Sequence, residues 1–140
     1  MNKQKLTGFV EKYSLGNTIE SVPWSIKSNT LTTEFVSEDR TLLGSVTLNS
    51  FAIDDAEIGI YNTTQLQKMI SVLGSDVTVN LKKADKRAIA IDMTDGDVSL
   101  NYMLADLDII PKAPKLKTLP DTTVVIEINN DFITKFVRAK

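Results

Sequence analysis

The chain has 140 residues, enough for one domain with a core of its own and part of a second, and it carries a net charge of −2. It contains neither cysteine nor histidine, which excludes disulfides, thiolate-bound metals and Ser-His-Asp catalysis. No apolar run approaches the roughly 20 residues of a membrane helix, and the first residues do not resemble a secretory signal. We therefore expect a cytoplasmic protein that is not an enzyme and that needs no cofactor, metal or membrane.

Residues 3–14 have the periodicity of an amphipathic helix. Apolar side chains recur at i, i+3, i+4 and i+7 and form one stripe, namely Leu6, Phe9, Val10 and Tyr13. Gly16-Asn17 is expected to end the helix, because either residue accepts a left-handed backbone.

From Thr18 to Tyr61 the apolar period changes to two. This alternation predicts four short strands, around residues 22–26, 31–35, 45–48 and 57–60. Pro23 indicates that the first of them is an edge strand or carries a bulge, because proline cannot donate to a ladder. Trp24 next to it is most simply a core residue.

The second helix is the best specified element. Asn62 supplies an N-cap with Gln65 three residues later, and Gly74 is expected to close the helix. Its apolar stripe consists of Leu66, Met69, Ile70 and Leu73. Three further strands are predicted around residues 77–81, 88–91 and 98–102, with a hairpin at Asp95-Gly96-Asp97.

Residues 106–120 interrupt the pattern, because prolines alternate with lysines there, as in an extended connector. A strand is expected at residues 122–128, and a third helix starts at Asn129 or Asn130. Its Ile133, Phe136 and Val137 repeat the first helix's Leu6, Phe9 and Val10 at an offset of 127 residues. We therefore expect one domain at 1–105, a connector at 106–120 and the start of a truncated second domain at 121–140. A frayed terminal helix is the alternative.

The charges divide between helices and strands. The three helices hold seven basic and two acidic residues, a net +5, whereas the remainder holds nine basic and sixteen acidic residues, a net −7. The helix cations lie on the flanks or backs of the apolar stripes and include Lys5, Lys12, Lys68, Lys135 and Arg138. Mobile lysines facing away from a sheet suit a DNA backbone, although exposed helix faces also favour lysine for solubility alone.

Several carboxylates are candidates for metal ligands or for acid/base groups. Asp92, Asp95 and Asp97 partly follow the spacing of a calcium loop, but the glutamate that ends such loops is absent. A solvated hairpin turn is the simpler interpretation.

Three segments together resemble the DNA polymerase sliding clamps, and in detail those of T4-like bacteriophages. They are Glu57–Asn62 running into Leu66–Leu73, Asp108–Pro111 running into Leu119-Pro120, and Glu127 through Arg138. The resemblance implies an α+β clamp fold, with two helices packed on curved antiparallel sheet.

It also implies a function. Clamps of this kind are non-enzymatic subunits that encircle duplex DNA without sequence preference and tether the replicative DNA polymerase. They are opened by a clamp loader, and the phage proteins are homotrimers at full length. The alternative interpretation is a phage β-rich structural or protein-binding module without a DNA role.

Clamp partners bind through short peptides in apolar grooves near the connector. The resemblance places such a groove at Leu107, Ile109, Ile110 and Leu119. Adjacent residues of an extended chain point to opposite sides, so we expect one of Ile109 and Ile110 to be buried and the other exposed. Both could instead only fasten the connector to the sheet.

Overall fold

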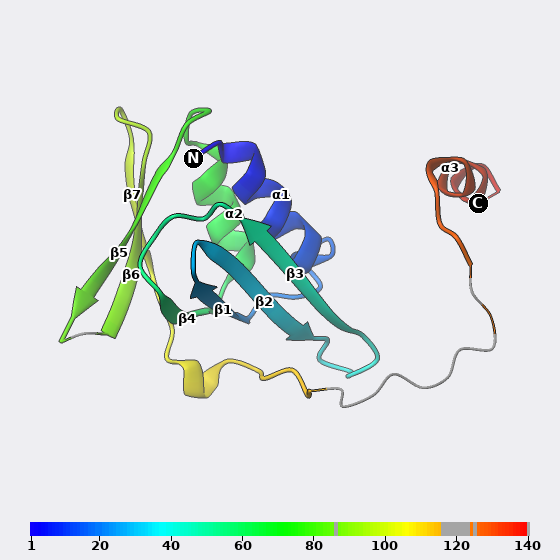
Figure 1. Ribbon diagram of the computed structural model, residues 1–140, viewed down its shortest axis with the longest axis horizontal. Helices are drawn as coiled ribbons and strands as arrows, with labels where there is room; N and C mark the ends of the chain where they lie inside the picture. Colours follow the sequence, from blue (N-terminus) through cyan, green and yellow to red (C-terminus); the bar gives the residue numbers. More distant parts are fainter. Residues whose placement is uncertain (86, 116–123, 125, 140) are drawn as a thin grey trace.

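The computed structural model describes every residue except 86, 116–123, 125 and 140 (Figure 1). In chain order its elements are α1 (Lys3–Ser14), β1 (Val22–Lys27), β2 (Thr30–Val36), β3 (Leu43–Asn49), β4 (Ala56–Ile60), α2 (Thr63–Ser71), β5 (Thr78–Ala84), β6 (Arg87–Thr94), β7 (Ser99–Met103), the 3-10 helix η1 (Leu107–Ile109) and α3 (Asn130–Arg138). The predicted α+β class and the order of the two helices and seven strands up to residue 103 are confirmed.

The strands form two antiparallel sheets. One has the order β3-β2-β1-β4 and the other the order β5-β6-β7. Backbone hydrogen bonds link segments next to the sheets at two places. Met1, before α1, and Val77, before β5, exchange backbone hydrogen bonds, and the N–H of Ala105, after β7, donates to the Gly59 carbonyl of β4 at 3.0 Å. The second link lies where the chain leaves β7 for the connector.

Pro23 lies in an inner strand without a bulge, so the expectation of an edge strand or a bulge is wrong. β1 pairs with β2 only from Ser25 onward, and Pro23 pairs on the other side with Gly59. The Pro23 carbonyl accepts a hydrogen bond of 2.7 Å from Thr33 Oγ1. The missing N–H is tolerated because the ladder with β2 has already ended at this point.

The first helix packs on the four-stranded sheet as its stripe predicts. Leu6, Phe9, Val10 and Tyr13 are all buried, and the Phe9 ring meets Trp24 of β1 edge to face at 5.5 Å. The helix ends at Ser14, as predicted, but the residue that caps it differs from the expected one. Leu15, with φ of 48°, takes the left-handed cap position ahead of Gly16.

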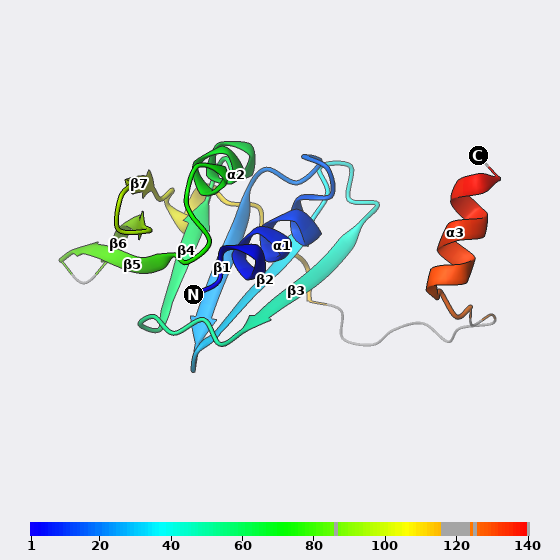
Figure 2. The ribbon, with the colours of Figure 1, turned by 90° about the horizontal axis from the view of Figure 1, so that it is seen from above.

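The second helix lies beside α1 (Figure 2). The Asn62 side chain accepts a hydrogen bond of 2.7 Å from the Gln65 N–H, which confirms the predicted N-cap. Leu66, Ile70 and Leu73 are buried, whereas Met69 is only half-buried and lies at the margin of the core. α2 ends at Ser71, before the expected stop at Gly74.

A polar contact fastens the two helices together. Lys3 Nζ donates to the carbonyl oxygen of Ser71, the last residue of α2, at 2.8 Å and also to that of Leu73. A cation at a helix C-terminus satisfies carbonyl groups that have no partner within the helix.

The strand expected at residues 122–128 falls largely outside the described residues. Residues 124 and 126–128 are described, and none of them lies in a strand. α3 is a regular helix capped by Asn129, and none of its residues is buried. Among the described residues it makes no hydrogen bond or ion pair with residues 1–115.

Candidate functional site

Lys5, Lys12 and Lys68 extend from the two helices that cover the four-stranded sheet. All three side chains are exposed, and Lys68 is opposite the buried stripe of α2. Among the described residues, none of the three forms an ion pair, whereas Lys27, Lys83, Arg87 and Lys135 each do. We call Lys5, Lys12 and Lys68 the helix-layer cations. Within the described part of the chain, none of them is neutralised by an ion pair with a carboxylate.

Two open grooves border these helix-layer cations. One of about 450 Å³ lies between α1 and α2, with Lys68 and Gln67 on one wall and Thr7 and Glu11 on the other. The other, of about 400 Å³, lies between α1 and β3 and has Lys5 and Lys12 along its rim. The lysines are spaced along two grooves instead of converging on one point, which suits an extended polyanion better than a single bound ion.

The other two predicted DNA-facing residues lie on α3. Lys135 and Arg138 are exposed, and Lys135 Nζ forms an ion pair of 2.7 Å with Asp131 one turn earlier. The same helix exposes an apolar stripe, formed by Phe132, Ile133, Phe136 and Val137. The structure thus brings together three of the five predicted cations, on α1 and α2, and leaves two on a separate helix.

The acidic side chains of the turns have local structural partners. Asp54 accepts from Lys83 Nζ at 2.6 Å, and this contact lowers the pKa of its carboxyl. Asp95 in the β6–β7 hairpin accepts from the backbone N–H groups of Gly74 and Val98. It therefore closes its own turn and also contacts the segment just after α2.

Among the described residues, no group of three or more acidic side chains is arranged to hold a metal ion. In the hairpin, the Asp95 carboxylate accepts the backbone N–H groups of Asp97 and Val98, which fits the interpretation of a solvated turn. In the part of the chain that the structure describes, no helix is long and apolar enough to span a membrane.

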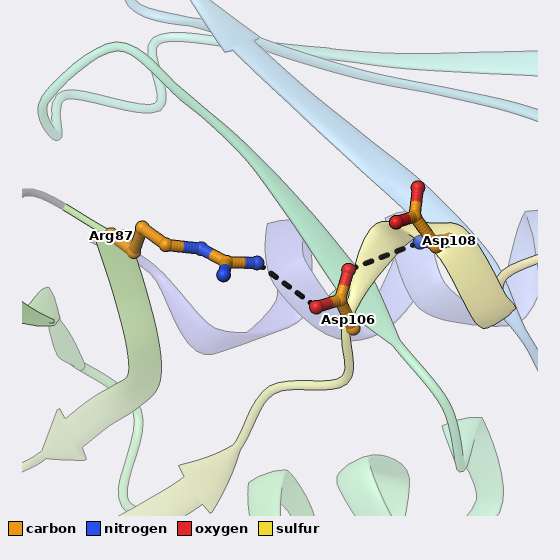
Figure 3. A network of polar contacts seen from close by, with 3 residues as sticks. All are labelled: Arg87, Asp106 and Asp108. Atoms are coloured by element: carbon orange, nitrogen blue, oxygen red, sulfur yellow. Dashed lines mark hydrogen bonds and ion pairs between the residues drawn. The ribbon is translucent and has the colours of Figure 1, made fainter.

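A second candidate site begins where the chain leaves β7. Asp106 caps η1 by accepting the Asp108 N–H at 3.2 Å, and its other carboxylate oxygen lies 3.0 Å from Arg87 Nη2 of β6 (Figure 3). The Asp108 N–H and, next, the Arg87 guanidinium lower the pKa of Asp106. These contacts fix the start of the connector against the three-stranded sheet.

The connector then crosses the face of the four-stranded sheet that lies opposite the helices. Val22, Trp24 and Ile26 of β1 point toward the helices, so Pro23 and Ser25, which alternate with them, point the other way. Between this face and residues 107–115 lies a groove of about 470 Å³. We call it the connector groove; its lining includes Pro23, Ser25, Leu107, Ile110 and Ala113, with Lys27, Glu34, Glu57, Lys112 and Lys115 at charged positions.

One of the two isoleucines is buried and the other exposed, as predicted. Ile110 is 4% exposed and lines the connector groove, whereas Ile109 is 62% exposed and does not line it. The physical reason differs from the expected one, because Ile109 ends the turn of η1 and only Ile110 is extended. Leu107 also lines the groove, and Leu119 lies outside the described residues.

Sequence reasoning missed the residues that fasten the connector. Arg87 and Asp106 are far apart in the chain, and neither carries a motif. In the sequence, Gly59 is a small residue within an alternating strand pattern, and nothing local marks it as special. Its contacts with residues 105 and 110 distinguish it in the structure. A glycine within a buried strand pattern is the one signal that could have indicated a close backbone approach.

No family model and no curated protein matches the sequence. Among solved structures, the chain is similar to PCNA from Thermococcus kodakaraensis, with a TM-score of 0.64 and 13% identity, over 86% of this chain and 50% of that one. It is also similar to the DNA polymerase III subunit beta from Pseudomonas aeruginosa, with a TM-score of 0.57 and 13% identity, over 82% of this chain and 32% of that one. The chain has the sliding-clamp fold.

Identity this low shows the fold and nothing finer. The chain spans half the length of the first of these clamps and about a third of the second. Neither structure is of a phage protein, so the clamp likeness is general and not specific to T4-like phages.

Proposed function

We propose that the chain belongs to a non-enzymatic sliding clamp that encircles duplex DNA and tethers a DNA polymerase in the cytoplasm, inside the host cell if the chain is viral. The observation that carries this proposal is the arrangement of charge within the clamp fold. The helix-layer cations lie on one face of the four-stranded sheet and form no ion pair with any residue that the structure describes, and the connector groove lies on the opposite face. One face suits the DNA backbone, and the other suits a protein partner.

Binding to DNA by this face is expected to be weak and independent of sequence. Lysines act on phosphates as mobile point charges, and each neutralised phosphate releases counterions, so affinity falls steeply with salt. A closed ring relies on topology for its hold on DNA, and the lysines need only let the duplex slide.

The segments around residues 57–62 and 66–73 support a clamp of the phage type, which would act as a homotrimer at full length and be opened by a clamp loader. The connector groove is the proposed site for a short peptide of the polymerase or the loader. Its apolar floor beneath a charged rim suits a peptide with one or two apolar anchors.

The test is a titration of the isotope-labelled chain with two duplexes of unrelated sequence at low salt, followed by amide chemical shifts. Shifts detect binding even at millimolar affinity. We expect both duplexes to perturb the same amides of α1 and α2, and the effect to vanish as salt is raised. Perturbation of the strands alone, or none with either duplex, would favour a binding module without a DNA role.

A further inference from the structure

Gly59 lies beneath the start of the connector, one residue before the end of β4. A Cβ at this position would lie 2.7 Å from the Ala105 carbonyl oxygen and 2.9 Å from Ile110 Cγ1. Cβ atoms do not approach other atoms this closely, so any side chain here would displace the connector or the strand. The backbone at Gly59 is not left-handed, and the need for glycine is therefore one of space and not of conformation.

The contacts around Gly59 determine the path of the connector. The Gly59 carbonyl accepts the Ala105 N–H at 3.0 Å, and Ile110 packs directly on the glycine from above. Between these two points, the Asp106–Arg87 ion pair holds the turn of η1 in place. Residues 105–110 are thus attached to β4 at both ends, and Ile110 is at once the second attachment and part of the groove floor.

We propose that Gly59 is a positioning residue for the connector groove, whose bare Cα lets Ile110 dock on β4 and so sets the distance between the connector and the sheet. This inference rests on the proposed function only in taking the groove as a peptide site. The docking itself is a property of residues 59, 105 and 110.

The chain offers matched controls for two kinds of variant. A Cβ added at Gly8, on α1, would meet no atom within 4 Å beyond its own chain neighbours and the backbone of its helix, so Gly8→Ala adds the same methyl group without a clash. Ile109 is the exposed neighbour of Ile110, so Ile109→Ala removes the same atoms as Ile110→Ala without touching Gly59.

The docking is tested by amide hydrogen exchange and by trypsin cleavage after Lys112 and Lys115. Gly59→Ala and Ile110→Ala are each expected to speed exchange at the Ala105 and Ile110 amides and cleavage at both lysines. Exchange of the α1 and α2 amides should stay as in the unmodified chain, which shows that the domain remains folded. Gly8→Ala and Ile109→Ala should change neither readout. Unchanged exchange and cleavage in both Gly59→Ala and Ile110→Ala would overturn the proposal.

The effect on binding is tested with twelve-residue peptides selected from a random display library on the unmodified chain. We expect peptides that shift the amides of residues 23–27 and 107–115, and we expect Gly59→Ala and Ile110→Ala each to weaken them by about tenfold, which corresponds to roughly 1.4 kcal/mol. Gly8→Ala should change their affinity less than about twofold.

The other outcomes separate the two proposals. The selected peptides could shift the groove amides and yet bind Gly59→Ala and Ile110→Ala as tightly as the unmodified chain. This result would overturn the positioning role of Gly59 but would still support the groove as a peptide site. Selected peptides that shift only residues away from the groove would contradict the groove as a peptide site.

Discussion

The Asp95 carboxylate accepts a hydrogen bond of 2.6 Å from the backbone N–H of Gly74, and this contact joins the β6–β7 hairpin to the segment that follows α2. The same carboxylate accepts the N–H groups of Val98 at 2.7 Å and of Asp97 at 3.0 Å. The hydrogen bonds from Val98 and Gly74 are the main causes that lower the pKa of Asp95. Its charged form is therefore stabilised by folding.

This predicts a stability that depends on pH. Because the folded-state pKa is lowered, Asp95 stabilises the fold above its unfolded-state pKa of about 3.9, and this contribution is lost as pH falls through the folded-state value. Asp95→Asn should be less stable than the unmodified chain at pH 7, and the difference should shrink below about pH 4. Urea denaturation across this range is the measurement.

Asp97→Asn is the control for this prediction. It removes a charge from the same turn, and among the described residues the Asp97 carboxylate accepts no hydrogen bond. A difference that Asp97→Asn reproduced would show that net charge and not the Asp95 contacts is responsible. A difference that stayed constant with pH would show that ionisation of Asp95 does not contribute.

Truncating side chains of α2 should destabilise the domain in proportion to how deeply each side chain is buried. Ile70 is 1% exposed, so Ile70→Ala leaves a cavity and should lower the free energy of unfolding by roughly 2–5 kcal/mol. Met69→Ala at the half-buried neighbour should lower it by only about 1 kcal/mol. Urea denaturation measures both, with circular dichroism to show that the native fold is retained. Equal losses for the two variants would contradict the observed orientation of the helix.

The pKa of the Asp106 carboxyl should depend separately on its two hydrogen-bond partners. The Asp108 N–H contributes more than Arg87 to the lowered pKa of Asp106. Arg87→Gln is therefore expected to raise that pKa only part of the way to its ordinary value, as followed by carboxyl NMR during an acid titration. A complete return to the ordinary value would mean that the cap of η1 forms only when the ion pair is present.

Much of this fold could be predicted from the sequence because its signals are local. The stripe of α1 and the Asn62 cap of α2 depend on neighbours within one or two turns, and both appear where expected. Pro23 could not be interpreted correctly, because whether a strand is inner or outer depends on partners distant in the chain.

The candidate site was predictable only in its general character. Lys5, Lys12 and Lys68 could be placed on exposed helix faces from periodicity alone. Which described carboxylates lie near enough to pair with them depends instead on how the turns are arranged in the fold. Likewise, the roles of Gly59 and Arg87 depend on contacts across 46 and 19 residues of chain.

Neutralising the helix-layer cations should weaken the response to DNA. In each of the single variants Lys5→Gln, Lys12→Gln and Lys68→Gln, we expect smaller shift changes with duplex DNA and a shallower dependence of affinity on salt, because fewer counterions are released. Lys82→Gln, which removes an exposed lysine from β5, is the control and should behave like the unmodified chain. An equal loss in the control would mean that only total charge matters.

The central claim, that duplex DNA lies against the α1–α2 face, is tested most directly by site-specific crosslinking. The chain has no cysteine, so Lys68→Cys on α2 and Lys27→Cys on β1 can each carry one maleimide photo-crosslinker without competing reactions. Lys27 lines the connector groove on the face opposite the helices. At low salt with a duplex of arbitrary sequence, we predict crosslinks from position 68 and few or none from position 27. Equal crosslinking from both positions, or crosslinking from position 27 alone, would contradict the account.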